Sequence, residues 1–133
     1  MKRHSVSLMS ILAAAALVAA AGSAQAQDAS AGERVFNQCK ACHQIGEGAK
    51  NTIGPVLNGV VNRKAGTVAG YSYSDANKNS GLTWDEATLT EYLPNPRAKV
   101  PGTKMTFMGL KKESDVQNVI AYLKTFNEDG SKK

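Results

Sequence analysis

Two cysteines and a histidine stand close together in the stretch FNQCKACHQIG, residues 36–46. Cys39 and Cys42 are the only cysteines in the 133-residue chain, and His43 directly follows the second. Three kinds of chemistry use these residue types at such a spacing: thiol–disulfide exchange, zinc binding and covalent attachment of a c-type haem. The rest of the chain decides among them, because each requires a different fold or a different set of further ligands.

The N-terminal residues predict an exported protein. A basic start, MKRH, precedes the apolar run ILAAAALVAAAG and the small-residue segment SAQAQ, which together form a secretory signal peptide. We expect residues 1–26 to be removed by cleavage after Ala26, leaving one domain, 27–133, in the periplasm. The alternative is an uncleaved membrane anchor, but the apolar run is shorter than the roughly 20 residues that span a bilayer. A cysteine near the cleavage point and a twin-arginine pair are both missing from the sequence.

The C-x-x-C-H motif fits haem attachment better than thiol exchange or zinc binding. A thioredoxin-like pair begins a helix that follows a strand, whereas Cys39 and Cys42 fall late in a predicted helix with no strand pattern before it. A zinc site normally takes four ligands, and the only other histidine, His4, would leave with the signal peptide. C-x-x-C-H is the signature of c-type haem attachment. Residues i and i+3 share a helix face, so both thiols can reach one haem edge while His43 meets the iron.

Composition and charge predict one small domain with a protein partner. Without Lys2 and Arg3 the 16 basic residues fall to 14, against 11 acidic ones, which gives a net charge of +3. Nucleic-acid binding usually shows denser basic stripes, so we expect this mild excess to favour docking on an acidic protein surface. A domain of this size buries a modest share of its surface and often needs a further stabilising group.

Apolar periodicity predicts three helices, over residues 31–44, 83–93 and 114–129. Asp28 or Ser30 could cap the first of them. The spacing places the C-x-x-C-H motif near the end of this first helix.

Capping residues set the expected limits of the other two helices. Thr83 and Glu86 form a capping box for the second helix, and Pro94 stops it. Asp115 suits the dipole at the start of the third helix, and Gly130 lies just beyond its expected end.

Two long irregular stretches, 45–82 and 94–111, lie between the predicted helices. They show no strand alternation, and a compact domain rarely contains so much irregular chain unless a function or a bound group organises it. We therefore predict an all-α, single-domain fold of about three main helices with long loops wrapped around one covalent haem.

The second axial ligand of such a haem would come from the irregular stretch 94–111. His43 is the only histidine after the signal peptide, and the only methionines there are Met105 and Met108. An isolated methionine is usually an ordinary core residue. A Pro-Gly turn stands just before Met105, however, in VPGTKMTFMG. We therefore favour Met105, with Met108 as the alternative; a His/Met pair leaves no open position and suits electron transfer.

Several segments together resemble the class I cytochromes c, in particular the soluble bacterial cytochrome c-two type, which is close to mitochondrial cytochrome c. The segments are CKACH, GPVLNGVVNR, GYSYSDANKNSGLTW, EYLPNPRAKVPGTKM and IAYLK. The resemblance runs from about Gly32 to Lys124, in the same order and spacing. It implies a monomeric electron-transfer protein, not an enzyme, that moves single electrons between membrane-bound redox complexes.

The resemblance also implies roles for individual residues. Cys39 and Cys42 would form the thioethers, and His43 and Met105 would bind the iron. The carbonyl of Pro55 would accept a hydrogen bond from the other nitrogen of His43.

Two polar groups of residues complete the implied haem site. The inner haem propionate would be held by Arg63, Tyr73 and Trp84. A polar network beside the methionine would be made by Tyr92, Asn77 and Thr103. Without the resemblance, simple core packing would be the preferred interpretation of Tyr92 and Trp84.

Basic residues around the haem edge are implied to dock acidic patches of the partners. They are Arg97, Lys99, Lys104, Lys111 and Lys112. The partners would be a cytochrome bc complex as donor and a reaction centre, oxidase or reductase as acceptor. Gln38 and Ala98 stand where relatives often have lysine, and Glu33 adds a negative charge nearby, so the basic ring is thinner than in mitochondrial relatives.

Two other functional classes make different predictions. A c-type haem enzyme or gas sensor would have an open iron site that binds carbon monoxide readily. A thiol oxidoreductase would be colourless and would carry two exchangeable thiols.

Overall fold

The computed structural model describes residues 15–16 and 27–133. Apart from residues 15–16, the predicted signal peptide, 1–26, lies outside the described residues, so its cleavage stays a prediction. Within the described part, no helix has the length and apolar character needed to cross a membrane.

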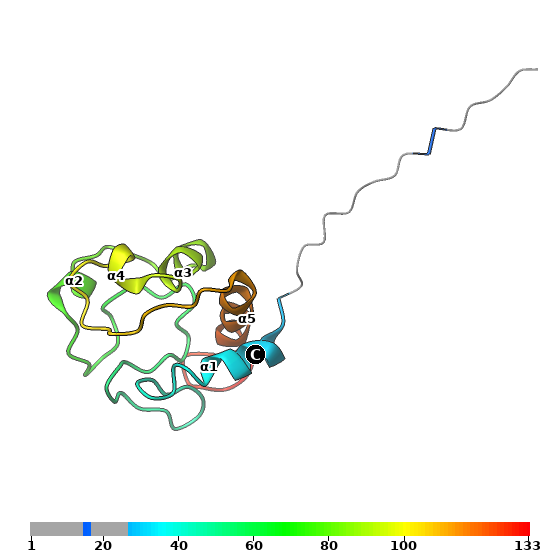
Figure 1. The fold of residues 1–133 in the computed structure, drawn as a ribbon. Helices are drawn as coiled ribbons and strands as arrows, with labels where there is room; N and C mark the ends of the chain where they lie inside the picture. The colour runs from blue at the N-terminus through cyan, green and yellow to red at the C-terminus, as the bar shows by residue number, and fades with distance from the viewer. Residues whose placement is uncertain (1–14, 17–26) are drawn as a thin grey trace, which may run out of the picture.

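Residues 27–133 form five helices (Figure 1). They are α1 (Ala29–Phe36), α2 (Asp75–Lys78), α3 (Glu86–Tyr92), α4 (Pro96–Lys99) and α5 (Glu113–Lys124). Extended pairing in the described chain is limited to isolated bridges, Lys64 with Thr83 and Phe126 with Lys132. The prediction of an all-α, single-domain fold is confirmed.

Helix α1 is shorter than the predicted 31–44. Asp28 caps it, accepting hydrogen bonds from the backbone N–H groups of Ser30 and Ala31. Beyond Phe36 most bonds span three residues instead of four, for example from Cys39 N to Phe36 O at 2.8 Å. This tighter winding ends the α-helix, and a few residues of apolar spacing cannot distinguish the two. The prediction that the cysteines lie on the helix is therefore wrong: they lie on the turns that follow it.

The predicted limits of α3 and α5 also need correction. Asp85, not Thr83, caps α3, accepting a hydrogen bond from Thr88 N at 2.7 Å, because Thr83 is held in its bridge two residues too early. Helix α5 ends at Lys124 instead of continuing to residue 129, and Gly130 belongs to a turn beyond it.

The two long irregular stretches contain short helices that the sequence pattern did not predict. Helix α2 lies within 45–82 and α4 within 94–111, and each has only four residues. Four residues are too few to show a helical period. Their caps are local, since Ser74 and Asn95 accept hydrogen bonds from backbone N–H groups at the two N-termini.

Helices α1 and α5 cross closely at Gly32, and this contact forms one end of the core. An added Cβ at Gly32 would lie 1.9 Å from the backbone oxygen of Asn118 and 2.8 Å from Cβ of Tyr122. Next to the crossing, the rings of Phe36 and Tyr122 lie 5.4 Å apart, and Ile120 is fully buried. The crossing joins the first and last of these helices, and Cys39 packs against the core just beyond it.

We expect Gly32→Ala to lower the free energy of unfolding by about 1–3 kcal/mol, because the added methyl group overpacks the crossing. Ser30→Ala, on the exposed side of the same helix, is the control and should leave stability almost unchanged. Chemical denaturation of both variants measures the difference. Equal stability of Gly32→Ala and the parent protein would contradict the close crossing.

Candidate cofactor site

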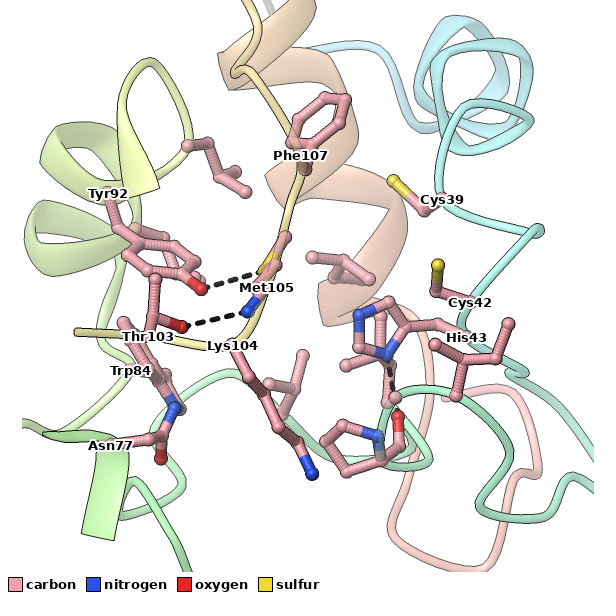
Figure 2. A pocket seen from close by; sticks show the side chains of 18 of the residues that line it. Cys39, Cys42, His43, Asn77, Trp84, Tyr92, Thr103, Lys104, Met105 and Phe107 are labelled. Atoms are coloured by element: carbon pink, nitrogen blue, oxygen red, sulfur yellow. Dashed lines mark hydrogen bonds between the residues drawn. The ribbon is translucent and has the colours of Figure 1, made fainter. Parts of the chain in front are cut away.

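A pocket of about 450 Å³ lies between the turns after α1, the loop around Pro55, helix α3 and the segment that carries Met105. Figure 2 shows Cys39, Cys42 and His43 on one side of it and Met105 with Tyr92 on the other. Its walls are mainly apolar, as in most cofactor sites. The chain therefore brings its two thiols, its imidazole and a thioether to one cavity.

The imidazole of His43 is fixed by a backbone carbonyl. Nδ1 of His43 lies 2.7 Å from the oxygen of Pro55. A carbonyl can only accept, so Nδ1 carries the hydrogen and Nε2 keeps a free lone pair, the form of histidine that binds metal. Burial lowers the pKa of His43, which also favours the neutral ring.

Gly54 makes room for this ring, a role that the sequence did not predict. A Cβ at Gly54 would lie 2.4 Å from Cε1 of His43 and 2.7 Å from Nδ1. The backbone there is tied to the motif, because Gly54 N donates to Cys42 O at 2.7 Å. The only sequence signal was a glycine next to a proline in GPVL.

The surroundings of the cysteines do not favour thiol exchange. Burial, with a smaller contribution from Cys42, raises the pKa of the Cys39 thiol to about 11. Redox-active cysteines instead have lowered pKa values. Zinc is also disfavoured, since nowhere in residues 15–16 and 27–133 do three His, Cys, Asp or Glu side chains gather as metal ligands.

The methionine side of the pocket is held by hydrogen bonds. The turn before it contains Gly102, whose φ of 88° favours glycine. The hydroxyl of Tyr92 lies 2.9 Å from Sδ of Met105, and Met105 N donates to Oγ1 of Thr103 at 3.2 Å. Burial raises the pKa of Tyr92 to about 12, so this hydroxyl keeps its proton. Met108, by contrast, is 71% exposed and does not line the pocket.

Arg63, Tyr73 and Trp84 all line the pocket, each with a different protein partner. Nη1 of Arg63 donates to two backbone carbonyls of its own loop, and burial lowers the pKa of this guanidinium. The hydroxyl of Tyr73 accepts a bond from Val68 N at 3.0 Å. The ring of Trp84 packs 4.5 Å from that of Tyr92.

Asn77 carries the main indication of a further ligand. Its side-chain oxygen is buried in the pocket wall and has no hydrogen-bond partner among the described residues. Native proteins rarely leave such an atom unpaired. The mixture of an apolar cavity, two thiols, an available imidazole nitrogen, a thioether and an unpaired amide oxygen fits a haem.

Most of the apolar wall of the pocket is not predicted from the sequence to belong to the site; Trp84 and Tyr92 are the exceptions. Eight of the fourteen buried apolar residues of the described chain also line the pocket: Phe36, Val60, Trp84, Leu89, Tyr92, Leu110, Val119 and Leu123. Helical periodicity predicts that Leu89, Val119 and Leu123 are apolar core residues. It cannot say that this core is the wall of a pocket.

The basic residues predicted to dock partners lie on α4, on the Met105 segment and just before α5: Arg97, Lys99, Lys104, Lys111 and Lys112. Three of them have intramolecular partners. Lys99 pairs with Glu91 at 2.5 Å, Lys104 donates to the carbonyl of Ser72, and Lys111 donates to two backbone carbonyls.

Comparison with known proteins settles the family. The cytochrome c family model matches residues 29–127. The chain belongs to the cytochrome c family. This membership, with Cys39 and Cys42 in the C-x-x-C-H spacing, means that it carries one covalent haem c. It is an electron-transfer protein and not an enzyme.

Relatives in this family extend over most of the chain. A cytochrome c2 of Blastochloris viridis is 59% identical over 117 residues, covering 88% of this chain and 92% of the relative. A cytochrome c2 of Rhodoblastus acidophilus is 64% identical over 107 residues, covering 80% of this chain and all of the relative. The solved structure of cytochrome cH from Methylobacterium extorquens is 54% identical, with a TM-score of 0.69, and covers 74% of this chain and 98% of that one. The predicted resemblance to the bacterial cytochrome c-two type is confirmed.

We expect Gly54→Ala to reduce haem incorporation and to destabilise the protein by about 1–3 kcal/mol, because the new methyl group displaces the His43 ring. Gly48→Ala is the control for haem content alone, since nothing lies within 4 Å of a Cβ at that position but its φ of 76° strains any side chain there. The ratio of haem to protein absorbance and the thermal midpoint measure the two effects. Normal haem content and stability in Gly54→Ala would show that the ring has room to move.

Proposed function

We propose that the protein is a soluble, monomeric electron carrier of the periplasm that shuttles between membrane-bound redox complexes. In this proposal the signal peptide, 1–26, directs export and is removed, and residues 27–133 form the working domain. The N-terminal sequence pattern and the similarity to cytochromes c2 support it. A cytochrome bc complex is the proposed donor, and a reaction centre, oxidase or reductase is the proposed acceptor.

The proposed axial ligands are Nε2 of His43 and Sδ of Met105. The observation that carries this proposal is the pocket itself, which His43 and Met105 line from different segments while Met108 is exposed. Bound haem supplies an iron that gains and loses one electron, and a His/Met pair raises its reduction potential. The chain's task is to close the iron to other ligands and to hold both side chains still, so that little reorganises on electron transfer.

Polar residues of the pocket are proposed to support these ligands. Tyr92 and Thr103 would hold the methionine, as their bonds to Met105 indicate. Arg63, Tyr73 and Trp84 would hold the inner propionate, because a buried carboxylate is costly without partners. For Asn77, whose side-chain oxygen has no partner in the described chain, we propose a place in the polar network beside the methionine.

We propose that partners dock through Arg97, Lys99, Lys104, Lys111 and Lys112. The side chain of Lys112 is exposed and takes part in no hydrogen bond or ion pair with the described residues. It is therefore free to approach an acidic partner, whereas Lys99 must first leave Glu91. Charges of this kind mainly raise the association rate.

The ligand assignment is tested by two methionine variants, Met105→Ala and Met108→Ala. The parent protein should show a sharp reduced c-type spectrum, a weak far-red band when oxidised and no reaction with carbon monoxide. Met105→Ala should lose the far-red band and bind carbon monoxide, because the iron position is open. Met108→Ala should behave like the parent.

Either of two results would contradict this assignment. If the parent bound carbon monoxide readily, the protein would be an open-site haem protein instead of a closed carrier. If Met108→Ala opened the iron and Met105→Ala did not, the ligand would be Met108.

The docking proposal predicts that Lys112→Glu slows reaction with an acidic membrane redox complex, by about threefold or more at low ionic strength. The effect should shrink as salt rises, since exposed charges are screened beyond about 8 Å at physiological ionic strength. Lys133→Glu makes the same charge change beyond the other end of α5, where Lys133 N bonds to Thr125 O, and Lys133 is not among the proposed docking residues. Stopped-flow kinetics compare the two, and equal slowing by both variants would refute a local docking surface.

A further inference from the structure

The residues after α5 fold into a compact unit, 125–133, which we term the C-terminal hairpin. Asn127 N donates to Ser131 O at 2.8 Å, and Lys133 N donates to Thr125 O at 2.8 Å. The ammonium of Lys132 lies 4.7 Å from the centre of the Phe126 ring, a cation–π contact. These contacts hold the C-terminal hairpin in a defined conformation.

The chain that holds His43 forms a second unit, made of residues 42–46 and 54–59, which we term the proximal bracket. Its two segments run side by side. Gly54 N donates to Cys42 O at 2.7 Å, and Leu57 N donates to Gln44 O at 3.1 Å. The His43–Pro55 bond lies between these two links, so the geometry of that bond depends on the pairing of the bracket.

The far end of the bracket is joined by Asn58, which is 8% exposed. Its side-chain oxygen accepts from Gly46 N at 2.7 Å, and its amide donates to Gly46 O at 2.9 Å. Arg63 is tied to the same point, because Nη1 donates to Asn58 O at 3.0 Å. Arg63 is therefore anchored directly at this end, and His43 is anchored to it through the paired segments of the bracket.

The C-terminal hairpin packs on this end at two glycines. A Cβ on Gly130 would lie 2.2 Å from the carbonyl oxygen of Gly46, the atom that Asn58 binds. A Cβ on Gly59 would lie 2.6 Å from Cγ of Glu128 and 3.1 Å from its Cα. Such close approach of two backbones is possible only without side chains.

We propose that the C-terminal hairpin is a positioning element that clamps the proximal bracket and so fixes the orientation of His43 and Arg63 toward the haem. Gly130 lies directly against Gly46, and Glu128 packs over Gly59. Burial lowers the pKa of Arg63, and the negative charge of Glu128 is among the smaller effects that oppose this. The inference rests on the proposed role of His43 as an iron ligand.

The test is Gly130→Ala in the holoprotein, with a second variant that ends at Asp129. The first pushes on Gly46 and the second removes the contact, so both should loosen the bracket. We expect the Nδ1 proton of His43 and the amide of Leu57 to exchange with solvent about tenfold faster, which corresponds to about 1.4 kcal/mol in opening free energy. Nuclear magnetic resonance measures both rates.

Two controls separate a local effect from general destabilisation. The amide of Leu110, which bonds to Leu93 O at 2.8 Å on the methionine side, should keep its exchange rate. Gly48→Ala adds a methyl group at a positive φ of 76° in the same loop but meets no atom within 4 Å. It should leave the His43 proton unchanged.

The proposal would be overturned if exchange at His43 stayed at the parent rate in both hairpin variants. It would also be overturned if His43, Leu57 and Leu110 all accelerated equally, since the hairpin would then serve stability alone. Binding of carbon monoxide by the parent would contradict the closed-carrier proposal instead, and exchange at Leu57 would still report on the clamp.

Discussion

The hydrogen bond from Nδ1 of His43 to the carbonyl of Pro55 constrains the whole arrangement, because it fixes which nitrogen faces the pocket. For that bond to form, the motif and the Pro55 loop must run side by side, and Gly54 must lack a side chain. Part of the irregular stretch 45–82 therefore serves to hold the imidazole of His43 in place. Residues as distant in sequence as Gly130 contribute to the same support.

The two sides of the pocket are held by different kinds of interaction. The histidine side is fixed by backbone groups, which cannot change rotamer, whereas the methionine side relies on a side-chain hydroxyl, Tyr92 to Met105. A thioether is a weak ligand and a weak acceptor, so its position depends on the surrounding packing. The buried ring of Tyr92 provides this packing, because it lies against Trp84 and holds its hydroxyl beside the thioether.

Sequence reasoning predicted the chemistry of this protein better than its local geometry. The C-x-x-C-H motif and the Pro-Gly turn before Met105 have fixed spacings, so they are readable without coordinates. The end of α1 was predicted wrongly because three-residue and four-residue winding carry the same short apolar pattern. The roles of Gly54 and of the hairpin were not predictable, since both depend on contacts between distant segments.

The apolar wall of the pocket has a consequence for how the protein is made. Eight of fourteen buried apolar residues in the described chain also line the pocket, so without the haem much of the core would lack apolar contacts on one side. A chain that fails to receive haem should stay open to proteases. We therefore expect haem incorporation to decide which copies of the chain persist.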